Sequence, residues 1–123
     1  MGKKVIVVDD AATVRQQVGM ALKQAGYDVL EATDGQEGKT LIDKTPDAAM
    51  VICDVNMPRM NGLEMLEALK QSGRLAKLPV IMLTTEGQPQ LMQRAKAAGA
   101  KGWMVKPFKA NLLVATVQKL TGA

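Results

Sequence analysis

Five short apolar runs alternate along the chain with longer segments whose apolar residues recur at helical spacing. Four of the runs are almost continuously apolar, as expected for strands that are covered on both faces. Regular alternation of strand and helix favours a parallel sheet with right-handed crossovers and helices on both sides. We therefore predict an α/β fold with a βα unit repeated five times. The expected strands are Val5–Val8, Val29–Ala32, Ala49–Cys53, Val80–Leu83 and Gly102–Val105.

The segments between and after these runs carry helix signals. Asp34 precedes Glu37 by three residues, which is the spacing of a capping box, and Pro89 suits a first helical turn. Gly26 and Pro46 are typical of helix ends. The apolar positions of the five expected helices are Val14, Val18, Leu22 and Ala25; Leu41 and Ile42; Leu63, Leu66 and Leu69; Leu91, Ala95 and Ala98; and Leu113, Val117 and Leu120.

The composition of the chain argues against several classes of function. The 123 residues, 47% of them hydrophobic, predict one globular domain over 1–123, with no output domain after the fifth helix. The net charge of +4 is spread along the chain, which argues against nucleic-acid binding. No apolar stretch approaches roughly 18 residues, and the lone Cys53 indicates a reducing compartment, so we expect a cytoplasmic protein that is not inserted in a membrane. The absence of histidine excludes histidine-based catalysis.

Polar residues follow four of the expected strands directly. Asp9 and Asp10 follow the first strand, Asp54 the third, Thr84 the fourth and Lys106 the fifth. In open parallel sheets, ligands bind beyond the carboxyl ends of the strands. We therefore expect these side chains to form one site at that edge of the sheet.

Such a cluster suits phosphoryl transfer to an aspartate. Carboxylates that repel one another favour a bound cation, and Mg²⁺ prefers oxygen ligands. A carboxylate can act as a nucleophile, and the transferred phosphoryl group needs positive charge and donors, which Lys106 and Thr84 would supply. The segment VVDDAAT lacks the glycines of a dinucleotide-binding loop or a P-loop. A haloacid dehalogenase-type phosphatase would have a second aspartate where this chain has Asn56.

Each residue also has a simpler interpretation. Asp9 and Asp10 are compatible with a strand-end turn that caps a helix, and Lys106 with a solvated lysine. Thr84 is compatible with a plain strand residue, and Trp103 with a cover over the fifth strand. The functional interpretation rests on the occurrence of all these signals together.

Four motifs, VVDD, DVNMPRMNG, PVIMLTTE and KGWMVKPF, occur in an order and spacing that resembles the receiver domains of two-component response regulators. The resemblance covers the whole chain. It implies the flavodoxin-like fold, a three-layer sandwich around a parallel sheet of strand order 2-1-3-4-5.

The resemblance also implies residue roles. Asp54 corresponds to the phospho-acceptor and also to a metal ligand. Asp10 corresponds to the direct Mg²⁺ ligand, Asp9 acts beside it, and Asn56 contributes its backbone carbonyl. Mg²⁺ is thus the expected cofactor.

The same family resemblance assigns the switch. Thr84 corresponds to the hydroxyl that moves to the phosphoryl group, Lys106 to the ammonium that pairs with it, and Trp103 to the mobile aromatic residue. The bond between Lys106 and the following proline is expected to be cis. Glu86 stands at a position that tunes hydrolysis of the acyl phosphate. Thr85 replaces the usual alanine or glycine and is expected to narrow access to the phosphoryl group.

Within the family the chain is most similar to chemotaxis regulators of the CheY type. This implies a monomeric switch that takes its phosphoryl group from a sensor histidine kinase. It would then bind a flagellar motor switch protein, or another downstream protein, through its fourth helix, fifth strand and fifth helix. Beyond its own phosphorylation and slow dephosphorylation, no enzymatic activity is expected. The alternatives are a phosphorelay intermediate or phosphate sink and, with less support, an aspartate-based phosphatase.

Overall fold

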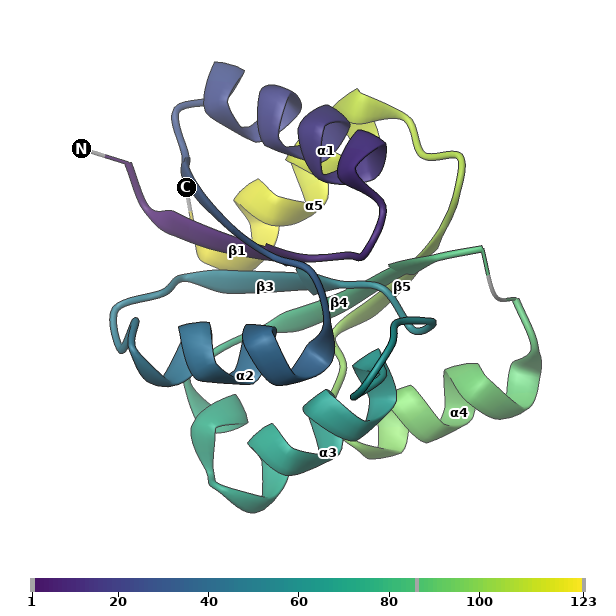
Figure 1. Ribbon diagram of the computed structural model, residues 1–123. Helices are drawn as coiled ribbons and strands as arrows, with labels where there is room; N and C mark the ends of the chain where they lie inside the picture. The colour runs from purple at the N-terminus through teal and green to yellow at the C-terminus, as the bar shows by residue number, and fades with distance from the viewer. Residues whose placement is uncertain (1, 86, 123) are drawn as a thin grey trace.

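The computed structural model describes residues 2–85 and 87–122. Its centre is a five-stranded sheet in the order β2-β1-β3-β4-β5, in which every neighbouring pair is parallel (Figure 1). The predicted fold class and strand order are confirmed. The strands are β1 (Lys4–Val8), β2 (Asp28–Ala32), β3 (Met50–Cys53), β4 (Val80–Thr84) and β5 (Gly102–Val105).

Helices cover both faces of the sheet, which gives the three predicted layers (Figure 1). Helices α1 (Ala12–Gln24) and α5 (Ala110–Thr121) lie on one face. Helices α2 (Gly35–Asp43), α3 (Gly62–Gln71) and α4 (Pro89–Ala97) lie on the other. Within the described ranges, no helix is long and apolar enough to cross a membrane.

One short 3-10 helix, η1 (Arg74–Ala76), was not predicted. It follows Gly73, whose φ of 79° turns the chain after α3. A single turn of this kind leaves no hydrophobic period in the sequence, so periodicity could not reveal it.

The core is divided by the sheet into two clusters. Val5 and Val7 of β1 pack with residues of α1 and α5, whereas Ile6 and Val8 pack with residues of α2, α3 and α4. This alternation follows from the pleat of a strand, because successive side chains point to opposite faces. All the residues of β3 and β4 are buried, as their apolar runs predicted.

The edge strand β5 differs from that prediction. Its sequence GWMV is apolar, yet its residues are half-buried or exposed, and Val105 retains 47% of its accessible surface. The cause is its position in the sheet, since β5 pairs only with β4. An apolar run of four residues does not distinguish a central strand from an edge strand.

The strand register brings the predicted polar residues to one edge. Asp54 directly follows β3, and its backbone N–H donates to the carbonyl oxygen of Val8, at 2.9 Å. Farther along the sheet, the N–H of Lys106 donates to the carbonyl oxygen of Thr84, at 2.8 Å. The strand ends that carry these residues are therefore hydrogen-bonded neighbours. Strand β4 ends at Thr84, one residue later than predicted, so Thr84 is the last residue of the strand instead of the first residue after it.

Candidate functional site

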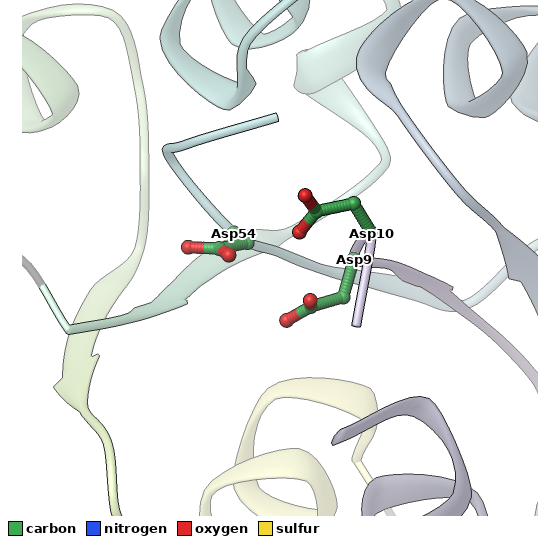
Figure 2. A group of neighbouring side chains, drawn as sticks. All are labelled: Asp9, Asp10 and Asp54. Atoms are coloured by element: carbon green, nitrogen blue, oxygen red, sulfur yellow. The ribbon is translucent and has the colours of Figure 1, made fainter. Parts of the chain in front are cut away.

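Three aspartates gather at the carboxyl edge of β1 and β3 (Figure 2). Each of Asp9, Asp10 and Asp54 offers one carboxylate oxygen, and these three atoms lie within 4.8 Å of one another. Asp9 and Asp54 are buried, with 2% and 7% of their surface accessible, whereas Asp10 is exposed. The cluster is therefore open to solvent on the side of Asp10.

Lys106 joins the two buried aspartates. Its Nζ donates to Oδ2 of Asp9, at 2.7 Å, and to Oδ2 of Asp54, at 3.2 Å. The other oxygens of these carboxylates accept backbone hydrogen bonds: Oδ1 of Asp9 from Ala11, at 2.9 Å, and Oδ1 of Asp54 from Val55, at 2.7 Å. Each buried carboxylate is thus held on two sides, which fixes its orientation at the edge of the sheet.

Burial, hydrogen bonds and neighbouring charges shift two pKa values in the cluster. Burial raises the pKa of Asp9 above its ordinary value, despite the hydrogen bonds from Lys106 and Ala11, and the nearby charge of Asp54 adds to the rise. Burial alone would lower the pKa of Lys106, but the hydrogen bond to Asp9 and the charges of Asp54 and Asp9 outweigh it and raise that pKa. The ammonium therefore stays charged and only partly compensates three acids.

The donor set fits Mg²⁺. All three side chains present hard oxygen atoms, and the exposed Asp10 leaves room for water, which Mg²⁺ retains when it binds proteins. The neighbouring Cys53 does not add a soft ligand, because it is fully buried and burial raises the pKa of its thiol. Cys53 is the small buried residue that its place in an apolar run predicted.

The remaining predicted residues lie around this cluster. Thr84 is fully buried at the end of β4, whereas Thr85 is exposed and lines a surface pocket with Lys106 and Phe108. Asn56 lies two residues after Asp54, in the connection between β3 and α3, with an exposed side chain. The peptide bond between Lys106 and Pro107 is cis, as predicted.

Trp103 lies on β5, away from the acidic cluster. It is half-buried, pairs in register with Met82 and packs against the core cluster beneath α2, α3 and α4. It also lines a pocket of about 280 Å³ with residues of α4, including Met92 and Lys96. Its movement on phosphorylation stays a prediction. Glu86, the predicted tuner of hydrolysis, lies outside the described residues.

Sequence reasoning missed one arginine beside the site. Nη1 of Arg15, on the first turns of α1, donates to the backbone oxygen of Asp9 at 2.7 Å, and its Nε donates to Glu31 at 3.1 Å. The arginine thus connects the end of β1 to β2. Its position in the sequence gave no sign of this contact, which depends on how α1 packs over the strand ends.

The comparisons with known proteins agree with this geometry. A family model described as the response regulator receiver domain matches residues 5–118, which is nearly the entire chain. The chain belongs to the response regulator receiver domain family. The family resemblance drawn from the four sequence motifs is therefore confirmed.

Receiver domains named for chemotaxis are among the relatives. The chain is 38% identical over 120 residues to the chemotaxis protein CheY1 of Helicobacter pylori, with 97% of each chain covered. It is 41% identical to the solved chemotaxis protein CheY4 of Vibrio cholerae, with a TM-score of 0.89 and with 98% of this chain and 99% of that chain covered. A CheX-CheY-BeF3-Mg complex from Borrelia burgdorferi contains a similar chain, 26% identical, with a TM-score of 0.89 and coverage of 96% and 88%.

Proposed function

We propose that this receiver domain accepts a phosphoryl group on Asp54 from the phosphohistidine of a sensor kinase. The observation that carries the proposal is the double contact of Lys106, whose ammonium joins the carboxylates of Asp54 and Asp9 within an acidic cluster. A carboxylate in this setting is oriented by a backbone N–H, accompanied by a fixed cation, and reachable from the solvent side.

The transfer forms one bond and breaks one. A carboxylate oxygen of Asp54 attacks phosphorus, a P–O bond forms, and the P–N bond breaks so that its electron pair returns to the histidine nitrogen of the kinase. Lys106 then pairs with the new phosphoryl oxygens, and the hydroxyl of Thr84 donates to them. Asp9, Asp10, Asp54 and the carbonyl of Asn56 would hold Mg²⁺, which when bound supplies positive charge against the phosphoryl oxygens.

Phosphorylation then changes the face formed by α4, β5 and α5. Movement of Thr84 toward the phosphoryl group leaves space beneath α4, and Trp103 turns inward from the β5 surface. Lys96 and Lys101 line the pocket beside Trp103, and their charge favours an acidic partner. The chemotaxis names of the relatives support a flagellar motor switch protein as that partner.

Trp103 is the only tryptophan in the chain, so its fluorescence tests the proposal with a single source of signal. We would add Mg²⁺ and then beryllofluoride to the wild type and to Asp54→Ala, and follow binding of the mimic by mass spectrometry and fluorescence. We expect a Mg²⁺-dependent change in the wild type and none in Asp54→Ala. A mimic that binds both proteins alike would remove Asp54 from the acceptor role.

The same proteins separate the alternative functions. An acidic motor-switch peptide that binds more tightly after beryllofluoride addition supports the chemotaxis role. Equal peptide binding before and after addition, with an intact adduct, indicates a phosphorelay or phosphate-sink receiver instead. Repeated turnover of simple phosphate esters at Asp54 would indicate a phosphatase.

A further inference from the structure

Arg59, a few residues after Asp54 in the chain, has an unusual backbone conformation. It lies in the loop 55–61, which connects β3 to α3 and includes Asn56. Its φ is 64°, and among residues 2–85 and 87–122 it is the one non-glycine residue with positive φ. This left-handed region is unfavourable for a long side chain and persists where the surrounding structure compensates for it. Contacts of Arg59 with its surroundings must therefore stabilise this backbone conformation.

The compensation comes from Asp34, the N-cap residue of α2. Its carboxylate is buried, with 2% of its surface accessible. Oδ1 accepts the backbone N–H of Glu37 at 2.8 Å, and Oδ2 accepts Nε of Arg59 at 2.8 Å and also its Nη2. The hydrogen bond from Glu37 and the guanidinium lower the pKa of Asp34, so the acid stays ionised. One carboxylate thus caps α2 and holds the loop.

A backbone contact joins the same two segments. The N–H of Gly35 donates to the carbonyl oxygen of Met60 at 2.8 Å. A Cβ atom on Gly35 would lie 2.3 Å from that oxygen, so the close approach requires glycine. The middle of the loop is therefore fastened to the start of α2 by a side-chain pair and by the backbone.

We infer that the Arg59–Asp34 ion pair is a positioning contact, which holds the loop 55–61 in the conformation that offers the carbonyl of Asn56 to Mg²⁺. The inference rests on the proposed function, in which Asn56 is a metal ligand. Arg59 does not touch the metal in this scheme. It acts through the loop, because Asn56 is three residues away on a segment whose far end is fixed to α2.

Arg59→Asn tests the inference, because asparagine tolerates positive φ but cannot reach Asp34 as a guanidinium does. Loss of a positive charge alone would strengthen Mg²⁺ binding, whereas loss of positioning weakens it. We expect calorimetric titration to show about tenfold weaker Mg²⁺ binding, as for residues that orient metal ligands. Lys39→Gln is the matched control, since it removes a positive charge and an ion pair, with Asp43, from α2.

A second measurement needs no metal. Hydrogen exchange of the loop amides 55–61 should be faster in Arg59→Asn than in the wild type, and unchanged in Lys39→Gln. Arg59→Lys retains the charge but lacks the planar guanidinium. Its loop amides should exchange at a rate between those of the wild type and Arg59→Asn. It also serves if Arg59→Asn does not fold.

The outcomes distinguish this inference from the proposed function. Arg59→Asn with wild-type loop exchange and Mg²⁺ binding at least as tight as in Lys39→Gln overturns the positioning role and leaves the proposed function intact. A wild type that binds no Mg²⁺ overturns the metal site of the proposed function, and with it the role assigned to Arg59.

Discussion

At the scale of single residues, the position of Asp54 depends on a glycine that contacts its backbone. Gly62, the first residue of α3, donates its N–H to the carbonyl oxygen of Val55 at 2.9 Å. A Cβ atom at this position would lie 2.0 Å from the backbone oxygen of Asp54 and 3.0 Å from Sγ of Cys53. The start of α3 can approach the proposed acceptor this closely because residue 62 has no side chain.

Gly62→Ala should therefore disturb both stability and phosphorylation. The added methyl group must displace backbone atoms, and we expect a loss of about 2 kcal/mol in the free energy of unfolding. Urea denaturation measures this loss, and the rate of phosphorylation by a small phosphodonor should fall with it. Gly87→Ala is the control, since a Cβ atom there meets nothing within 4 Å. Equal stability of the two variants would contradict the packing argument.

At the scale of elements, α3 and α4 are connected by an ion pair. Nε and Nη2 of Arg94 donate to the two carboxylate oxygens of Glu67, at 3.0 and 2.8 Å. Lys70 adds a hydrogen bond from its Nζ to the backbone oxygen of Ala97, at 2.8 Å. Both charged side chains of the ion pair are 40% or more exposed, so water weakens their attraction.

A double-mutant cycle with Glu67→Gln and Arg94→Gln should give a coupling energy of about 0.5 kcal/mol at neutral pH. The hydrogen bond from Arg94 lowers the pKa of Glu67 below its ordinary value of 4.5. The coupling is therefore complete above that value and disappears as the pH falls through the lower, folded-state pKa. Urea denaturation at neutral and at acidic pH measures the coupling energy and its loss. A coupling that persists after Glu67 is protonated would show that charge is not its source.

The elements and their order could be predicted from the sequence, because hydrophobic periodicity depends on the local chain. The strand ends at Asp9, Asp54 and Lys106 located the site for a related reason: the carboxyl ends of parallel strands share one edge. Contacts between elements could not be predicted. Arg15 on Asp9 and Arg59 on Asp34 depend on how a helix or a loop packs over residues distant in the sequence.

At the scale of the whole molecule, the site lies at one edge of the sheet that divides the core into two halves. The strands separate a cluster on the α1 and α5 side from one on the α2, α3 and α4 side. At the carboxyl edge of the sheet, Lys106 reaches from the end of β5 to the ends of β1 and β3.

Repulsion among the three aspartates should limit the stability of the metal-free protein. Asp9 and Asp54, which both contact Lys106, already bring two negative charges together. The exposed Asp10 adds a third negative charge to this cluster. Two like charges about 4 Å apart in a water-like environment repel by about 1 kcal/mol. We therefore expect Asp10→Asn to be about 1 kcal/mol more stable to unfolding than the wild type without metal.

Mg²⁺ should reverse that ranking. A ligand that binds only the folded state, at about a hundredfold excess over its Kd, stabilises it by about 2.7 kcal/mol. Asp10→Asn lacks a proposed metal ligand and should gain much less, so we expect the wild type to become the more stable protein when Mg²⁺ is added. Thermal unfolding with and without Mg²⁺ measures the reversal. Asp28→Asn is the control, since it makes the same change at the first residue of β2, at the amino ends of the strands. Mg²⁺ should stabilise it as much as the wild type. An equal Mg²⁺ shift in Asp10→Asn would place the cation away from this cluster.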